Sequence, residues 1–212
     1  MKTMGFSELH LVSPRHFPDP QAQWRASRAT DVLDNARVHS TLDEALEGVA
    51  LAIACTARTR DIAVAAVSAR EAAARIASVA RTQPAALVFG NEKFGLTTEH
   101  VNQCGLIASI PANPEYSSLN LGAAVQVLTY EMRVAMLAED APPPERTLAP
   151  HEDVEGFYIH LETVMADTGF FDPEHPKKLM PRLRRLFARA GLETDEINIL
   201  RGILKAVSKP KK

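Results

Sequence analysis

Four short apolar runs, separated by polar and glycine-containing turns, are the first regular feature of the chain. They lie at residues 7–12, 49–56, 85–89 and 107–110. Runs of this length, rich in aliphatic and β-branched residues, are typical of strands buried in a parallel sheet. We therefore predict a parallel sheet built from these four segments.

Between and after these runs, apolar residues recur at helical spacing. The predicted helices cover residues 41–47, 68–81, 98–104 and 119–138. Ser40 is the expected N-cap of the first of them. Strands that alternate with helices predict an α/β fold, with a parallel sheet and helices on both of its faces.

The pattern breaks at residues 139–150, where four prolines predict an extended linker. Beyond it the spacing predicts three further helices, at residues 152–168, 176–190 and 194–207. Gly169 and Gly191 are the expected stops, and Thr194 is the expected cap of the last helix. The chain thus divides into a main domain (1–138), a linker (139–150) and a helical extension (151–208). The extension is too short for a large core of its own, so we expect it to pack on the main domain or on a partner subunit.

Composition limits the class of protein. Of the 212 residues, 46% are hydrophobic and 24% charged, which is ordinary for a globular protein. No run approaches the roughly 20 apolar residues of a membrane span, and no signal peptide opens the sequence, so we expect a cytoplasmic protein without membrane association. Cys55 and Cys104 have no metal-ligand spacing, and we expect two small buried hydrophobes and no metal.

Charge is unevenly distributed. The net charge is −2, yet residues 175–192 contain no acidic residue. The basic residues of this segment are Lys177, Lys178, Arg182, Arg184, Arg185 and Arg189. Such a cluster attracts a phosphate backbone. The spacing alone favours a solvated helix face.

Polar loops follow three of the predicted strands, at residues 55–60, 89–92 and 110–120. Parallel sheets bind their ligands at the carboxyl ends of the strands, so these loops form the candidate site. Gly90, directly after a strand, leaves the backbone open to close approach. Ser117 or Ser118 is the expected cap of the helix that begins at Leu119. Each feature alone is also that of an ordinary turn or cap.

Two of these loops carry longer motifs. Residues 89–96 read FGNEKFGL and residues 110–121 read IPANPEYSSLNL. Both closely resemble the last two motifs of the SpoU branch of the SPOUT RNA methyltransferases. The resemblance extends over nearly the whole chain, and within the branch it is to the tRNA (cytidine/uridine-2′-O-)-methyltransferases.

The resemblance implies a fold and partners that the residue pattern cannot give. It implies a C-terminal trefoil knot in the sheet, a homodimer, and S-adenosyl-L-methionine as methyl donor. By position, the implied cofactor contacts are Cys55, Thr56, Ala57, Gly90, Ile110, Ser117, Ser118 and Leu119. The implied groups of the reacting centre are Glu92, Ser118 and Asn120.

The implied reaction is 2′-O-methylation of a cytidine or uridine in tRNA, at anticodon-loop position 32. A ribose 2′-hydroxyl is a poor nucleophile at neutral pH, so a protein must align it and favour loss of its proton. Ser118 and Asn120 can orient the sugar by hydrogen bonds. Arg58 and Arg60 can bind the adjoining phosphate, although two arginines on a loop are also an ordinary surface pair.

The sequence departs from the family at its start. Relatives carry a strand and a loop of the form N-x-G-x-x-x-R-A, whose Arg is implied to activate the hydroxyl, and this sequence begins just after that motif. We interpret residues 1–4 as the last turn of a helix that ends at Gly5. We expect the 212 residues alone to be essentially inactive on tRNA.

Three other functions stay open. The first is 2′-O-methylation of ribosomal RNA. The second is a truncated, non-catalytic RNA-binding homologue, which the missing Arg favours. The third is a dinucleotide-dependent oxidoreductase, which is disfavoured because no G-x-G-x-x-G follows any predicted strand.

Overall fold

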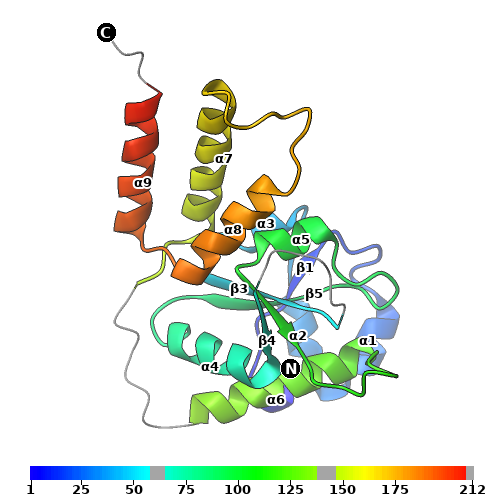
Figure 1. The fold of residues 1–212 in the computed structure, drawn as a ribbon. Helices are drawn as coiled ribbons and strands as arrows, with labels where there is room; N and C mark the ends of the chain where they lie inside the picture. The colour runs from blue at the N-terminus through cyan, green and yellow to red at the C-terminus, as the bar shows by residue number, and fades with distance from the viewer. Residues whose placement is uncertain (58–64, 138–146, 209–212) are drawn as a thin grey trace.

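The computed structural model describes residues 1–57, 65–137 and 147–208. Its main sheet has four parallel strands in the order β4-β6-β3-β5 (Figure 1). The bounds of these strands are Leu51–Cys55 (β3), Ala66–Ser68 (β4), Ala85–Phe89 (β5) and Leu106–Ser109 (β6). The predicted parallel sheet is confirmed, and three of its strands are those expected from the apolar runs.

The first apolar run does not join this sheet within the described residues. Its strand is only His10–Val12 (β1), and it pairs in parallel with Arg37–His39 (β2) in a separate two-stranded sheet. The prediction of one sheet containing this run is therefore wrong. Two hydrophilic residues flank the single apolar residue of β2, so its sequence carries no strand signal.

Helices cover both faces of the main sheet, as predicted. On one face Leu42–Ala45 (α3) and Thr98–Gln103 (α5) pack against Ala52, Ala54 and Ile107. On the other, Ala69–Val79 (α4) and Leu121–Leu137 (α6) pack against β3 and β6. Ile53 is fully buried on this second face, which places the core directly around the central strand.

Local hydrogen bonds fix where these helices begin. Ser68 and Glu71 form a capping box at the start of α4. Thr41, and not Ser40 as predicted, caps α3, because its hydroxyl accepts a hydrogen bond from the backbone N–H of Glu44. Ser40 instead donates its backbone N–H to the Glu44 carboxylate.

The N-terminal region contains four short helical segments within the described residues, and the sequence analysis predicted only the first of them. Their bounds are Lys2–Met4 (η1), Pro20–Ala26 (α1), Ser27–Ala29 (η2) and Thr30–Asp34 (α2). Gly5 ends η1 at φ 87°, in the left-handed region, which confirms the expected helical turn that stops at this glycine.

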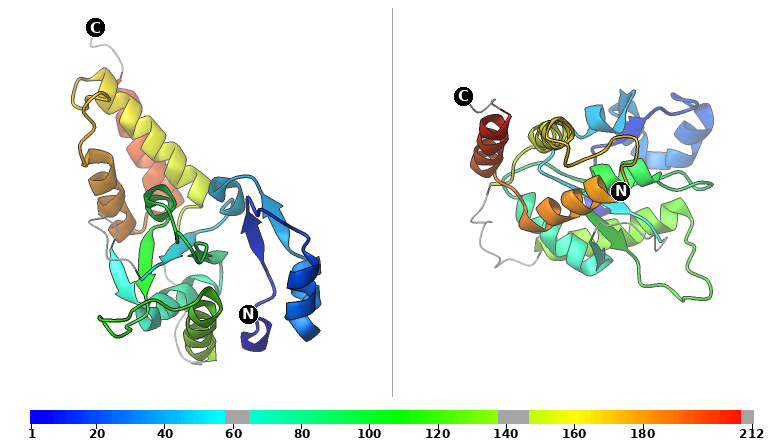
Figure 2. Two further views of the ribbon diagram at one scale, coloured as in Figure 1. Left: turned by 90° about the vertical axis from the view of Figure 1, so that its right-hand side faces the viewer. Right: turned by 45° about the horizontal axis from the view of Figure 1, so that its top comes forward.

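The last third of the described chain is helical. His151–Asp167 (α7), Leu179–Ala190 (α8) and Thr194–Val207 (α9) enclose a small core around Phe157 and Ile197. Helices α7 and α9 lie side by side and extend away from the sheet, while α8 lies near it (Figures 1 and 2). Glu193, and not Thr194 as predicted, caps α9 in a box with Glu196. None of the helices in the described ranges is both long and apolar enough to cross a membrane.

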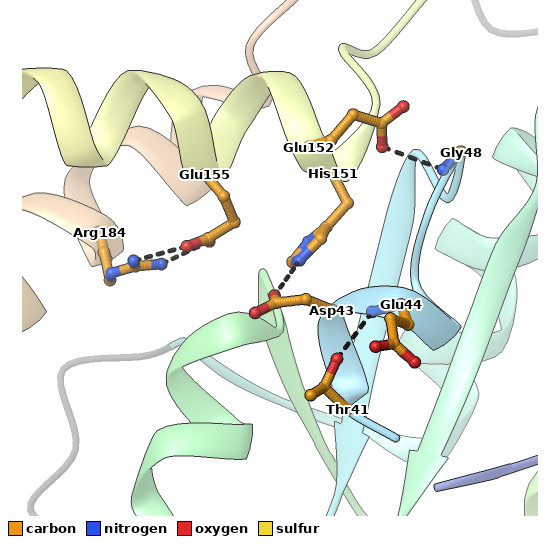
Figure 3. Close-up of polar contacts among 8 residues, drawn as sticks. All are labelled: Thr41, Asp43, Glu44, Gly48, His151, Glu152, Glu155 and Arg184. Atoms are coloured by element: carbon orange, nitrogen blue, oxygen red, sulfur yellow. Dashed lines mark hydrogen bonds and ion pairs between the residues drawn. The ribbon is translucent and has the colours of Figure 1, made fainter. Parts of the chain in front are cut away.

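The helical extension packs on the main domain, one of the two expected arrangements. At the start of α7, His151 lies 3.0 Å from the Asp43 carboxylate, and Glu152 accepts a hydrogen bond from the backbone N–H of Gly48 (Figure 3). The side chain of Gln83 accepts a hydrogen bond from the backbone N–H of Leu148, which precedes α7, and donates one to its C=O. Of the expected linker, residues 139–146 lie outside the described residues.

Candidate functional site

The three candidate loops start side by side. Cys55, the last residue of β3, pairs with Phe89 at the end of β5 and with Ala108 in β6. Because the strands are parallel, their carboxyl ends meet at one edge of the sheet. The expected convergence of these strand ends is confirmed.

The loop after β5 is a tight turn. The side-chain oxygen of Asn91 accepts a hydrogen bond of 2.7 Å from the backbone N–H of Phe94. The backbone carbonyl of Asn91 accepts one of 2.8 Å from the N–H of Gly95. Glu92 is exposed at the tip of this turn. The backbone of Gly95 and Leu96 lies directly against Gly90, in the space that a Cβ would occupy. The close approach expected at Gly90 is thus made by the protein's own chain.

The loop after β6 is open and polar. The side-chain oxygen of Asn113 accepts a hydrogen bond of 3.0 Å from the N–H of Glu115. The backbone carbonyl of Asn113 accepts one from the N–H of Tyr116. Tyr116 is 81% exposed. Ser117, Ser118 and Leu119 follow it and are exposed as well. Short-range bonds therefore hold the loop in shape while these side chains face solvent.

Asn120 occupies the start of α6. Its Oδ1 accepts a hydrogen bond of 2.7 Å from the N–H of Ala123. The helix begins at Leu121, so Asn120 performs the capping role that we predicted for Ser117 or Ser118. The hydroxyls of both serines are accordingly not used by this cap.

The end of β3 gives the third loop. Burial raises the pKa of the Cys55 thiol, with a further contribution from Cys104, and it raises the pKa of Cys104 to about 12. Both thiols are neutral at pH 7 and behave as apolar groups. The Thr56 N–H donates to the Ala108 carbonyl at 3.1 Å, which ties this end to β6, and Ala57 is exposed. Ile110 is half-buried against the core, and Arg58 and Arg60 lie outside the described residues.

The basic segment splits into two kinds of residue. Five of its six basic side chains are exposed: Lys177, Lys178, Arg182, Arg185 and Arg189. Arg184 instead forms two hydrogen bonds with Glu155, at 2.6 and 2.7 Å (Figure 3), and its guanidinium lies 4.4 Å from the centre of the Tyr158 ring. Burial disfavours its charged form, but the bonds and charge of Glu155 outweigh burial and raise the Arg184 pKa. Arg184 therefore holds α8 to α7.

Sequence reasoning missed the residues that shape these loops and the domain junction. Asn91 and Asn113 each begin a turn through their side chains, and asparagine before a Gly- or Pro-containing loop is a signal for such turns. The contacts of His151 and Glu152 join residues more than a hundred positions apart. No local pattern could have indicated them. Within the described ranges, no group of His, Cys, Asp and Glu side chains could hold a metal ion.

Comparisons with known proteins match both parts of the chain. The family model of the SpoU rRNA Methylase family matches residues 1–130, and that of the C-terminal domain of the tRNA methyltransferase TrmJ matches residues 152–212. The tRNA (cytidine/uridine-2′-O-)-methyltransferase TrmJ of Yersinia enterocolitica is 47% identical, over 100% of this chain and 85% of the relative. The protein of that name from Pectobacterium atrosepticum is also 47% identical, over 99% and 88%.

Solved structures agree with these matches. The crystal structure of TrmJ from Z. mobilis ZM4 has a TM-score of 0.85 at 33% identity, and the match covers 99% of this chain and 90% of that one. A probable methylase family protein from Haemophilus influenzae Rd KW20 has a TM-score of 0.61 at 38% identity, covering 97% and 86%. The chain belongs to the SpoU methylase family and, within it, to the members that carry the TrmJ C-terminal domain.

Proposed function

We propose that this protein methylates the ribose 2′-hydroxyl of a cytidine or uridine in tRNA, at anticodon-loop position 32. The observation that carries this proposal is that β5 and β6, on either side of β3, bring the FGNEKFGL and IPANPEYSSLNL loops to one edge of the sheet. The near full-length similarity to proteins named tRNA (cytidine/uridine-2′-O-)-methyltransferase supports it.

S-adenosyl-L-methionine is the methyl donor in this family, and when bound it supplies a methyl group activated by a sulfonium. The residues present fit such a cofactor. The turn at Gly90 is packed so closely that only glycine fits, which makes a rigid wall, and the loop after β6 presents hydroxyls and backbone groups to solvent. Backbone and hydroxyl groups can hold an adenosine without a charged partner. The residues that would hold the cofactor are Cys55, Thr56, Ala57, Gly90, Ile110, Ser117, Ser118 and Leu119.

Three side chains have roles toward the ribose in this proposal. The Oδ1 atom of Asn120 is used by the helix cap, so its amide nitrogen remains to donate a hydrogen bond to a sugar oxygen. The exposed Ser118 hydroxyl orients the sugar from the same loop. Glu92, exposed at the neighbouring turn, provides a carboxylate at this edge. Alignment of the reacting groups is the main contribution of such residues.

The tRNA backbone is bound by basic residues outside the reacting centre. Lys177, Lys178, Arg182, Arg185 and Arg189 are exposed and free of acidic neighbours in sequence, which suits phosphate contacts. Arg58 and Arg60 bind the phosphate next to the methylated ribose in this proposal. Arg184 has its guanidinium occupied by Glu155 and contributes structure instead.

The enzyme acts as a homodimer in this proposal, and α6 supplies the interface. Tyr130, Val134 and Leu137 are each about half exposed or more and recur at helical spacing on one side of α6. An apolar stripe of this kind on a surface helix is typical of a protein interface. Val134→Glu is expected to yield monomers in analytical ultracentrifugation, and an unchanged sedimentation coefficient would move the interface elsewhere.

The strand order of the main sheet and the packing of the helical extension support a knotted chain of two domains. β6 lies between β3 and β4, although it follows both in sequence, and this order supports a chain threaded into a trefoil knot. We assign residues 1–138 to the methyltransferase domain, 139–150 to a linker and 151–208 to a helical extension. The separate apolar cluster around Phe157 supports that division.

A nucleoside map tests the proposed activity. In a strain that lacks the gene, mass spectrometry of digested tRNA should show loss of 2′-O-methylated cytidine or uridine at position 32, and the gene should restore it. Loss from ribosomal RNA with intact tRNA would establish the alternative substrate. Intact methylation of both RNAs would support the non-catalytic RNA-binding protein.

A further inference from the structure

Two aromatic rings are exposed in the loops at the carboxyl edge of the main sheet. Phe94, in the turn after β5, is 58% exposed, and Tyr116, in the loop after β6, is 81% exposed. Strands β5 and β6 both pair with β3. Their loops therefore start about 10 Å apart, twice the spacing of neighbouring strands. Both rings lie at the edge where we place the reacting centre.

A hydrogen bond to an asparagine fixes the backbone of each ring residue. The N–H of Phe94 donates to Asn91 Oδ1 at 2.7 Å, and the N–H of Tyr116 donates to the Asn113 carbonyl at 2.9 Å. More than half of the surface of each ring residue is nevertheless left uncovered. A flat group that stacks on these rings meets a surface whose backbone is already ordered, so its binding costs less conformational entropy.

The charges beside the rings favour contact with bases over contact with phosphates. Lys93 Nζ lies 5.2 Å from the centre of the Phe94 ring. The other charged residues of the two loops are Glu92 and Glu115, both exposed. Two carboxylates against one ammonium group disfavour the close approach of a phosphate, whereas the face of a base carries no net charge. RNA at this edge is therefore suited to contact the protein through its bases.

The surroundings of the rings are unlike those of a protein-binding surface. In these two loops, which the structure describes in full, Leu119 is the one other large apolar side chain that is exposed. A stable protein interface has a contiguous core that is more apolar than this. Unpaired RNA is recognised differently, because its splayed bases stack singly on aromatic side chains.

We propose that Phe94 and Tyr116 stack on unpaired bases of the RNA substrate, next to the nucleotide whose ribose is methylated. This inference rests on the proposed function, because it takes the substrate to be an RNA loop. Tyr116 lies two residues before Ser118, so a base on its ring lies close to the ribose that Ser118 orients. Stacking is tolerant of sequence, since every base has a π-face. The two rings therefore position the RNA and do not select its sequence.

The fluorescence of 2-aminopurine, which changes when this base stacks, measures the contact directly. The full protein is titrated into tRNA anticodon stem–loops that carry 2-aminopurine at one unpaired position at a time. Wild-type protein should change the emission of at least one of these probes. Phe94→Leu and Tyr116→Leu should each reduce that change and weaken stem–loop binding at least about fivefold, because leucine keeps apolar bulk but has no ring to stack.

Variants that keep the ring separate stacking from other roles. Phe94→Tyr and Tyr116→Phe retain an aromatic face and should keep wild-type affinity and emission. Phe170→Leu makes the same change at a residue that is 71% exposed beyond the end of α7, and it should leave RNA binding unchanged. Each substituted side chain is largely exposed, so thermal unfolding of all these variants should match that of the wild type.

Three results would overturn the proposal. The first is the absence of any emission change with wild-type protein, and the second is unchanged RNA affinity in both leucine variants. The third is loss of affinity in Tyr116→Phe equal to that in Tyr116→Leu, which would assign the effect to the hydroxyl. If the leucine variants lost a dimer in sedimentation but kept RNA affinity, the rings would belong to an interface between two copies of the chain.

The nucleoside map of tRNA tests the proposed function separately. Methylation at position 32 that depends on the gene, together with unaltered RNA binding in the leucine variants, would overturn this inference alone. A map that does not depend on the gene would overturn the proposed function, whatever the 2-aminopurine probes report.

Discussion

In the loops after β5 and β6, at the carboxyl edge of the main sheet, side-chain hydrogen bonds join near neighbours in sequence, whereas at the amino edge they join residues far apart. Asn113 bonds Glu115 and Asn120 bonds Ala123 at the first edge. At the second, Gln83 bonds Leu148, and His151 contacts Asp43. The first edge keeps its shape without covering its own side chains. At the second edge, the contacts of Leu148 and His151 form only when the helical extension docks.

This difference predicts which substitutions affect catalysis and which affect stability. A side chain at the carboxyl edge can be altered without removing long-range contacts, so its loss should change activity more than unfolding. Residues at the junction should show the reverse. The following variants test this separation, in order of decreasing effect.

Gly90→Ala is the most damaging change expected. The new Cβ would meet the backbone of Gly95 and Leu96, which cannot move aside as a flexible side chain can. The turn must open, and cofactor binding measured by calorimetry should be lost together with methyl transfer. Gly202→Ala has nothing within 4 Å of its Cβ and is the matched control. Wild-type cofactor affinity in Gly90→Ala would show that the turn does not form the binding wall.

Asn120→Ala should lower the rate of methyl transfer about 100-fold, because the ribose loses a positioning group. It should also cost about 1 kcal/mol of stability through the lost helix cap. Asn120→Asp separates the two effects, since aspartate caps equally well but has no amide N–H to donate. Rates should be measured with labelled cofactor and tRNA, on protein preceded by the N-x-G-x-x-x-R-A segment on which we expect activity to depend, and unfolding should be measured in urea. Full activity in Asn120→Asp would exclude the proposed amide contact.

Arg184→Met should destabilise the protein by about 2–3 kcal/mol, because it leaves the Glu155 carboxylate half-buried without its partner. The double variant with Glu155→Gln should recover part of that loss. Urea unfolding followed by circular dichroism measures both. Replacing Arg185 and Arg189 by Gln should instead flatten the salt dependence of tRNA binding. If Arg184→Met changed tRNA affinity at unaltered stability, the separation of roles within α8 would be wrong.

The smallest effect expected is a pH dependence in the β1–β2 pair. The His10 and His39 rings stack with a ring nitrogen contact of 3.0 Å, and burial, followed by the charges of His39 and Arg37, lowers the pKa of His10. The folded protein therefore favours the neutral His10 ring, whose pKa in the unfolded chain is about 6.5. The resulting contribution to stability is fully present above a pH of about 6.5 and is lost as the pH falls through the lowered pKa of the folded state. Hydrogen exchange at Leu11 should therefore speed up at acidic pH relative to the intrinsic rate. His10→Phe should remove this dependence.

The fold was predictable where a segment carries its own signal. Residues 85–89 and 194–207 have the predicted bounds, because a buried strand and a capped amphipathic helix each show their period locally. The strand Arg37–His39 was missed, since pairing with β1 and not hydrophobicity makes it a strand. The helix over residues 119–138 begins two residues later than expected, because Asn120 competes successfully with the serines for the cap.

The candidate site was only partly predictable. Sequence order and the parallel-sheet rule placed the three loops together, and the structure confirms their common edge. The tight packing against Gly90 could not be inferred, because it depends on how residues 91–96 fold back. The pairing of Arg184 with Glu155 could not be inferred either. It makes Arg184 a structural residue, whereas the other five basic residues of the segment are exposed.

The position of β6 has a consequence for synthesis of the protein. The ribosome produces β3, β4 and β5 first, but β4 has no neighbour in the main sheet until β6 arrives beside it. Nascent chains that end before residue 106 therefore carry an incomplete sheet with exposed strand edges. Such edges are prone to pair with other chains, and long-range parallel pairing is slow. The last strand of the sheet to be made thus decides when the earlier ones are protected.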